Sequence, residues 1–276
     1  FNIAVKGNFD DCQNLVKSMF SDKEFSNQIN MSGVNSINWA RIVAQSVYYF
    51  YCYFLVEDDN QAINFSVPTG NFGDVYSGYV AKKMGLPIDK LIVATNSNDI
   101  LKRVIDTGIY KPLEVKYTVS PSMDIQIASN FERLIFDICN SDSKKTIKFM
   151  EQLNKKGVFQ LEKKDLERIQ KDFVSESLSE DETKSIIKEI YKDQGILIDP
   201  HTAVGVGAMK KQTQFGKTIV LATAHPSKFF ETVMKQTGIK PELPEDLKSI
   251  LDEKEKYEQL PKDLKNVQNY ILNNVK

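Results

Sequence analysis

The segment from Ser66 to Asp74, Ser-Val-Pro-Thr-Gly-Asn-Phe-Gly-Asp, combines small and polar residues that suit the binding of a phosphate group. Gly70 and Gly73 carry no side chain that would block a close approach of the backbone, Asn71 can hydrogen-bond an oxygen or a ring substituent, and Asp74 can cap a following helix. A tight turn in which the glycines only adopt unusual dihedral angles explains the spacing about as well. The segment lacks the glycine patterns of dinucleotide and P-loop sites, which argues against NAD or ATP.

A second polar loop, Ala222-Thr-Ala-His-Pro-Ser-Lys228, also follows an apolar run. Thr223 could hydrogen-bond a heterocyclic nitrogen, and Lys228 could neutralise an anion. His225 and Pro226 could instead only shape the start of a helix. Two loops of this kind at one edge of a sheet would indicate a ligand site.

A third polar group consists of Asn35, Ser36, Asn38 and Arg41, at the start of a long apolar helix. Arginine suits carboxylate or phosphate recognition because its planar fork donates two parallel hydrogen bonds. The same arginine could instead form a surface or interdomain salt bridge.

His201, in Asp199-Pro-His-Thr-Ala-Val204, is one of only two histidines and lies at an expected helix N-terminus. It could cap or pack there as readily as act as an acid or a base. With two histidines and three widely separated cysteines, the sequence supports neither a metal site nor a disulfide framework.

The elements that must position these residues follow a strand-loop-helix-strand order. Ile63–Val67 and Leu91–Thr95 are expected strands, and the helix between them spans Asp74 to Met84. A further strand is expected at Thr218–Ala222 and a long buried helix at Trp39–Leu55. Such units build an open, mostly parallel sheet with flanking helices, so the fold class is α/β. Parallel strands would bring the first two polar loops to one rim of the sheet, where such sheets bind ligands.

Composition narrows the class of protein. The 276 residues include 36 basic and 37 acidic side chains, and this net charge of -1 gives no field that would attract nucleic acid or an anionic membrane. The longest apolar stretch, Val43 to Val56, is too short to cross a bilayer, and no leader opens the chain, which predicts a cytoplasmic protein. The chain begins at Phe1 rather than Met, so we expect its natural start to lie upstream.

Several segments in order resemble the threonine synthase family, whose members are tryptophan-synthase-β-like enzymes of fold type II that depend on pyridoxal 5'-phosphate (PLP). The resemblance rests on seven stretches: Gly7–Gln13, Asn35–Ile42, Ser66–Asp74, Ala94–Asp99, Ser120–Ile125, Asp199–Ala203 and Thr223–Phe229. They span nearly the whole chain and correspond to the C-terminal half of such an enzyme.

The resemblance implies a PLP site and a reaction. The residues implied to bind PLP are Gly70, Asn71, Phe72, Gly73, Asp74 and Thr223, with Thr223 facing the pyridine nitrogen. Asn35, Ser36, Asn38 and Arg41 are implied to grip the phosphate or carboxylate of the substrate. The implied enzyme is a carbon-oxygen lyase acting on phosphates, which converts O-phosphohomoserine and water into threonine and phosphate in the last step of threonine biosynthesis.

The resemblance also implies an incomplete site. The Schiff-base lysine of the family precedes the region matched by Phe1, so no catalytic residue is expected in this chain, and the missing N-terminal half is its expected partner. Residues 1–38 would end the small domain, and residues 39–276 would form the large PLP-binding domain with a charged helical insertion at about 141–194. Two alternatives remain open: a phospholyase that gives 2-oxobutyrate, and a non-catalytic phosphate-binding module.

Overall fold

The computed structural model describes residues 1–7, 9–33, 38–56 and 59–275 and divides the chain into two compact units. The smaller unit combines Phe1–Gly33 with Leu243–Lys276, and the larger one comprises Val34–Glu242. Each unit has its own hydrophobic core. No helix in the described parts of the chain is long and apolar enough to cross a membrane.

The larger unit is built on a four-stranded parallel sheet. Its strands are β2 (Ile63–Pro68), β3 (Ile88–Thr95), β6 (Phe173–Ser177) and β7 (Thr218–Val220), in the order β6-β3-β2-β7. In the register, Phe65 of β2 lies opposite Leu91 of β3 and Ile219 of β7. The expected α/β class with a parallel sheet is therefore confirmed.

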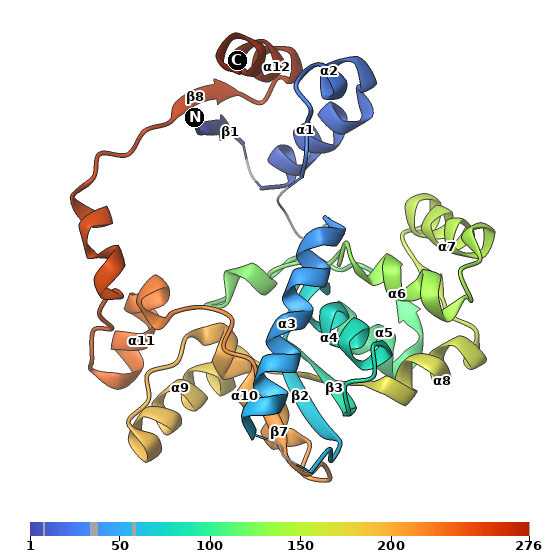
Figure 1. Ribbon diagram of the computed structural model, residues 1–276, viewed down its shortest axis with the longest axis vertical. Coiled ribbons are helices and arrows are strands. Elements are labelled where there is room, and N and C mark those ends of the chain that lie inside the picture. Colours follow the sequence, from blue (N-terminus) through green and yellow to red (C-terminus); the bar gives the residue numbers. More distant parts are fainter. Residues whose placement is uncertain (8, 34–37, 57–58, 276) are drawn as a thin grey trace. The chain divides into compact units, whose positions relative to one another are not determined.

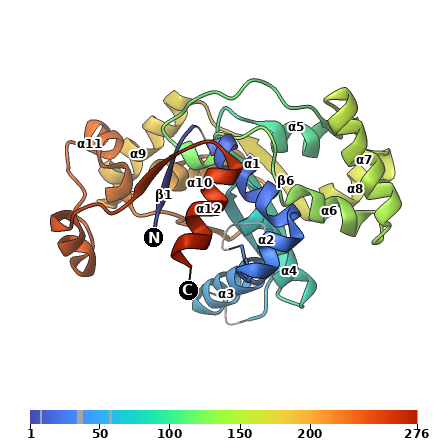
Figure 2. The same ribbon diagram turned by 90° about the horizontal axis from the view of Figure 1, so that it is seen from above.

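Helices cover both faces of this sheet, as seen in Figure 1 and, from above, in Figure 2. Alternate residues of a strand point to opposite faces, and Leu91 and Val93 join one core cluster while Ile92 and Ala94 join the other. Helices α3 (Trp39–Val56) and α4 (Gly73–Lys83) contribute to the first cluster, and α10 (Pro200–Lys211) contributes to the second.

The segment 141–194 is not simply the charged helical insertion that its composition predicted. It contains β6, an edge strand of the main sheet, whose Phe173 is buried in the core. The further elements of the larger unit are α5 (Ile100–Thr107), β4 (Ile109–Tyr110), η1 (Pro121–Met123), α6 (Phe131–Ile138), α7 (Ser143–Lys156), β5 (Phe159–Gln160), α8 (Lys163–Asp172), α9 (Glu180–Gln194), η2 (Pro226–Phe229) and α11 (Phe230–Thr237).

The smaller unit joins the two ends of the chain. Strand β1 (Ile3–Lys6) pairs in parallel with β8 (Glu258–Pro261), and its helices are α1 (Phe9–Ser21), α2 (Lys23–Gln28), η3 (Glu245–Asp252) and α12 (Leu264–Asn274). Met19, Phe25 and Val267 form its core. This grouping differs from the expected division, which assigned 243–276 to the large domain, because the pairing of β1 with β8 joins residues about 255 positions apart and leaves no local trace in the sequence.

Candidate functional site

The loops that follow β2 and β7 leave the sheet at the same edge, because the two strands are neighbours and parallel. Thr69 N donates to the carbonyl of Ala94 at 2.8 Å, so the end of β3 meets the same edge. The carboxyl ends of parallel strands leave a crevice where open α/β sheets bind ligands. The structure thus brings the first two polar loops to one rim, as the sequence predicted.

Gly70 lies where another segment of backbone passes very close. A Cβ atom at this position would lie 2.6 Å from the carbonyl oxygen of Ser122, in η1. Neither Gly70 nor Gly73 has a positive φ, so the alternative that these glycines only provide unusual dihedral angles is wrong. Gly70 is needed for a close approach, which forms a narrow backbone cradle.

Phe72 is the residue of the loop with the left-handed backbone, at φ 65°. Its side chain is 0% exposed and packs against Phe131 and Phe173, with ring centroids 5.2 Å and 5.6 Å away. Only the backbone of Phe72 can therefore face a ligand. As the N-cap of α4 it makes no side-chain capping hydrogen bond, which leaves the helix N-terminus suited to an anion.

Asp74 does not cap α4, contrary to the expectation, because it lies inside the first turn. The single hydroxyl proton of Tyr49 is shared between two oxygens of Asp74, with Oη 3.0 Å from the carboxylate Oδ1 and 2.8 Å from the main-chain oxygen. Burial raises the pKa of Asp74 to about 6, and the bond from Tyr49 only partly opposes this effect. A carboxyl group that ionises less readily repels a nearby anion less strongly.

Asn71 holds the loop against α6. Its carbonyl oxygen accepts from the main-chain N–H and the Nδ2 of Asn130, at 3.0 Å and 3.2 Å. Ser129 Oγ donates to Asn71 Oδ1 at 3.4 Å. None of the hydrogen bonds described for this half-buried side chain uses its Nδ2, so that group can donate to a ligand.

A buried polar network fixes the turn that faces Gly70. Asp124 Oδ1 accepts hydrogen bonds from Asn96, Asn98 and Thr118 at 2.6–3.0 Å, and Asn96 Nδ2 also donates to Ser120 Oγ at 3.0 Å. Asn96, Asn98 and Ser120 are buried, and buried polar groups of this kind specify one arrangement when they are satisfied. The sequence did not mark these residues individually as members of a network.

His201 connects the same turn to α10. Its Nδ1 lies 2.8 Å from Asp199 Oδ1, and its Nε2 accepts from the main-chain N–H of Ser122 at 3.2 Å. Asp199 caps α10 and also accepts a short hydrogen bond from the Thr202 hydroxyl. Burial alone would raise the pKa of Asp199, but the hydrogen bonds from His201 and Thr202 lower it below its ordinary value.

Thr223 is exposed and lines a pocket of about 510 Å³ together with Asp199, Thr202 and His225. His225 Nδ1 accepts from Ser227 N at 3.2 Å and so caps η2, which agrees with the reading of His225 as a residue that shapes a helix start. Lys228 does not line this pocket, and its Nζ lies 5.8 Å from the ring of Phe229.

The third polar group is described only in part, since Asn35 and Ser36 lie outside the described residues. Asn38 Oδ1 accepts from Ala40 N at 2.9 Å and so caps α3, and Arg41 is exposed in the first turn of that helix. Neither of these two residues lines the pocket that contains Thr223.

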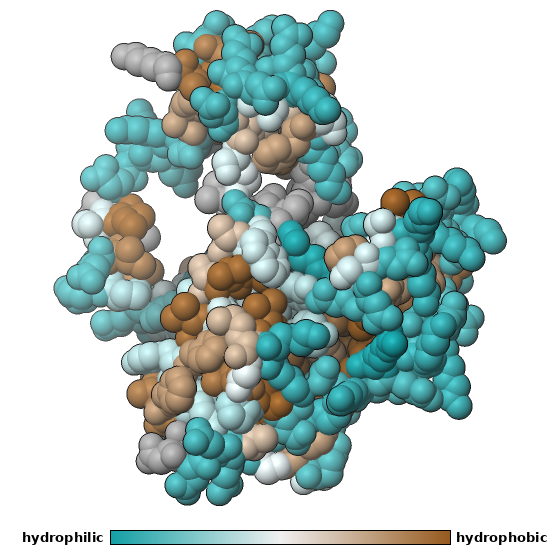
Figure 3. Space-filling view, turned by 45° about the vertical axis from the view of Figure 1, so that its right-hand side comes forward, coloured by the Kyte–Doolittle hydropathy of each residue, from teal (hydrophilic) through white to brown (hydrophobic). Residues whose placement is uncertain are grey.

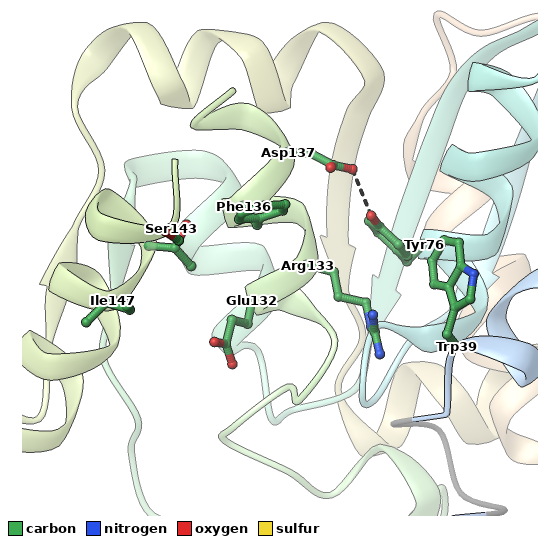
Figure 4. Close-up of a pocket in the computed structure, with 9 residues that line it drawn as sticks. Trp39, Tyr76, Glu132, Arg133, Phe136, Asp137, Ser143 and Ile147 are labelled. Atoms are coloured by element: carbon green, nitrogen blue, oxygen red, sulfur yellow. Dashed lines mark hydrogen bonds between the residues drawn. The ribbon is translucent and has the colours of Figure 1, made fainter. Parts of the chain in front are cut away.

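A further pocket of about 470 Å³, shown in Figure 4, was not predicted from the sequence. Arg133 lies with its guanidinium 5.6 Å from the ring of Trp39, and Tyr76 Oη donates to Asp137 Oδ2 at 2.7 Å. Burial and the neighbouring Asp137 raise the pKa of Tyr76 above its ordinary value. This pocket shares no lining residue with the Thr223 pocket.

Comparisons with known proteins find similarity to threonine synthases. A family model described as "Threonine synthase, C-terminal" matches residues 202–271. The chain is 42% identical over 273 residues to threonine synthase of Pseudomonas aeruginosa, which covers 98% of the chain and 58% of that protein. It is 44% identical to threonine synthase of Saccharomyces cerevisiae, with 92% and 55% covered.

A solved structure of PLP-bound threonine synthase from Brucella melitensis superposes with a TM-score of 0.92 at 45% identity, covering 99% of the chain and 59% of that protein. The chain thus spans less than two thirds of the length of these relatives. Over nearly its whole length it is similar in sequence and fold to the C-terminal part of threonine synthases, which confirms the expected resemblance and fold class.

Proposed function

We propose that this chain, similar over nearly its whole length to the C-terminal part of threonine synthases, supplies the cofactor-binding part of a PLP-dependent carbon-oxygen lyase. The proposed reaction converts O-phosphohomoserine and water into threonine and phosphate. The observation that carries the proposal is the backbone cradle at Gly70, where a Cβ would lie 2.6 Å from Ser122 O, beside the uncapped N-terminus of α4. That geometry suits a phosphate group at the carboxyl edge of a parallel sheet.

The described residues fit PLP in three respects. The main chain of Gly70, Asn71, Phe72 and Gly73 would hold the phosphate, since the Phe72 side chain belongs to the core. Asn71 Nδ2 would bind a ring substituent. Asp74 would act indirectly, because its bond with Tyr49 joins the first turn of α4 to α3.

Thr223 would hydrogen-bond the pyridine nitrogen. The hydroxyl group can donate or accept a hydrogen bond but carries no negative charge, so it would leave that nitrogen less protonated than a carboxylate would. When bound, PLP supplies the electron sink that stabilises carbanions at the substrate, and the protein chooses which bond is oriented for cleavage.

Substrate recognition is proposed for Asn35, Ser36, Asn38 and Arg41. Arg41 is exposed and could donate paired hydrogen bonds to the phosphate or carboxylate of O-phosphohomoserine. Asn38 caps the same helix by accepting from Ala40 N through Oδ1.

The lysine that attaches the cofactor and moves protons would come from the part of the relatives that precedes the matched region. We propose that this part packs on α3, whose apolar side chains gather on the face seen in Figure 3. Eight large apolar side chains of this helix are each 40–65% exposed: Trp39, Val43, Val47, Tyr48, Tyr51, Phe54, Leu55 and Val56. The helix carries Arg41 as its only charged residue, and so apolar a helix is normally buried.

The test uses the chain extended upstream, by its own coding sequence, to the length of the relatives. Purified protein should show the visible absorption band of bound PLP and should release threonine and phosphate from O-phosphohomoserine. Release of 2-oxobutyrate would favour the phospholyase alternative. Binding of PLP or phosphate without turnover would favour the non-catalytic module, and the absence of any binding would contradict the proposal.

The three free cysteines suit a reducing compartment, and we propose the cytoplasm.

A further inference from the structure

We propose that His201 is a positioning residue for the cofactor loop: its neutral ring holds the η1 turn against Gly70. The inference rests on the proposed function, since the loop that it supports is the one proposed to bind PLP. His201 would not touch the cofactor and would act through Ser122.

The hydrogen bonds fix the state of the ring. Ser122 donates its main-chain N–H, so the Nε2 of His201 must carry a lone pair. The ring proton is then on Nδ1, which donates to Asp199 Oδ1 at 2.8 Å. His201 is only 3% exposed, so water cannot easily replace either partner.

This arrangement bears directly on the cradle. The carbonyl of Ser122 faces Gly70, while the N–H of the same residue is held by His201. Ser120 and Asp124, on either side of η1, are anchored by Asn96, so His201 holds the middle of the turn from the side of α10. Asp199 also lines the pocket that contains Thr223, and the chain of contacts therefore joins the two proposed ends of the cofactor site.

A purely structural role is the competing explanation, because the ring of His201, at the start of α10, also lies 4.7 Å from the ring of Phe229, the last residue of η2. Two substitutions separate the roles. His201→Gln can place Oε1 where Nε2 lies and can still accept from Ser122. His201→Asn can place an amide where Nδ1 lies, which keeps a partner for Asp199 but not for Ser122. Both lose the contact with Phe229.

The two variants are compared in the chain extended to the length of the relatives. We measure the dissociation constant of PLP by absorbance and the hydrogen exchange of the Ser122 amide. His201→Asn should weaken PLP binding by about tenfold, the order expected when one hydrogen bond is lost, and should speed exchange at Ser122, whereas His201→Gln should change both much less. Equal PLP affinities in both variants, accompanied by similar losses of thermal stability, would overturn the inference.

A measurement on the unmodified chain covers the case in which a variant does not fold. The sequence contains two histidines, and their hydrogen bonds predict opposite neutral tautomers. The proton lies on Nδ1 in His201, whereas His225 Nδ1 accepts from Ser227 N, so the proton of His225 lies on Nε2. Nitrogen-15 spectra of the histidine rings should show one tautomer of each kind at neutral pH. An Nε2–H tautomer for His201 would overturn the inference. Failure of the extended chain to bind PLP would contradict the proposed function but would leave the tautomer and the amide exchange unaffected.

Discussion

Gly70→Ala tests the backbone cradle most directly. The new Cβ would lie 2.6 Å from Ser122 O, a distance that Cβ atoms essentially never adopt, and the next nearest atom is Met123 Cα at 3.4 Å. The contact is with backbone, so no side-chain rotation relieves it. The η1 turn is also held by His201 and the Asn96 network, so the turn cannot move away freely.

The magnitude follows from two opposing terms. Overpacking of this kind costs roughly 1–3 kcal/mol. Replacement of glycine by alanine restricts the unfolded chain and contributes about 0.4–1 kcal/mol in the other direction. The midpoints of the two ranges differ by about 1.3 kcal/mol, and we expect the free energy of unfolding of the larger unit to fall by about this amount.

Urea unfolding followed by tryptophan fluorescence measures this change, because the single tryptophan, Trp39, lies in the larger unit. Gly216→Ala is the matched control, since a Cβ there meets no atom within 4 Å and the glycine needs no positive φ. It should be neutral or slightly stabilising. If Gly70→Ala is as stable as Gly216→Ala, and PLP affinity is unchanged in the extended chain, then the argument for the cradle fails.

Three further substitutions test other parts of the reasoning. Phe72→Ala should lower the free energy of unfolding by about 3–5 kcal/mol in urea, as for other buried phenylalanines, and a surface role would give a change near zero. The folded-state pKa of Asp74 is about 6 against an ordinary 3.8, so its protonated form stabilises the protein below pH 3.8 and this contribution is lost as the pH rises through about 6. Asp74→Asn should therefore remove that fall in stability, and parallel pH profiles of the two proteins would contradict the assignment. Tyr51→Cys, on the exposed face of α3, is made with the three free cysteines replaced by serine, so that maleimide reports on position 51 alone. It should react in the 276-residue chain and be protected in the extended one, with the exposed Lys148→Cys as control. Protection that depends on protein concentration would instead indicate a second copy of the chain.

The central strands could be predicted because their signal is local. Apolar runs with branched side chains, bounded by Gly and Pro, predicted strands at 63–67 and 91–95, and the structure has β2 and β3 there. The common rim followed from these strands being parallel.

The missed elements depend on contacts between distant residues. Strand β6 reads Phe-Val-Ser-Glu-Ser, and Ser175 and Glu176 give it little strand character, but it pairs with β3 and buries Phe173. Strand β8 is recognised only through its pairing with β1. In both cases tertiary pairing overrides a weak local preference.

At the site too, the sequence identifies which residues are present but not what surrounds their side chains. A family motif identifies Phe72 and Asp74 by position, but it does not reveal that one side chain is buried between Phe131 and Phe173 while the other bonds to Tyr49. The buried Asn96 network likewise requires the fold, because its members come from segments more than 20 residues apart.

The contacts that shape the proposed cofactor site are separate from the surface proposed to receive the rest of the protein. Gly70, Ser122, His201 and Asp199 form one continuous series of contacts among described residues, and none of them lies on α3. Two described hydrogen bonds link α4 to α3, from Tyr49 Oη to Asp74 and from Ser77 Oγ to Gln45 Oε1. Tyr49 is buried and Gln45 is half-buried, so neither bond lies on the exposed face of that helix. The grip on a phosphate should therefore be preformed in this chain, whereas attachment of the cofactor should require the lysine from outside it. For this reason inorganic phosphate should protect the Ser122 amide from exchange in the 276-residue chain alone.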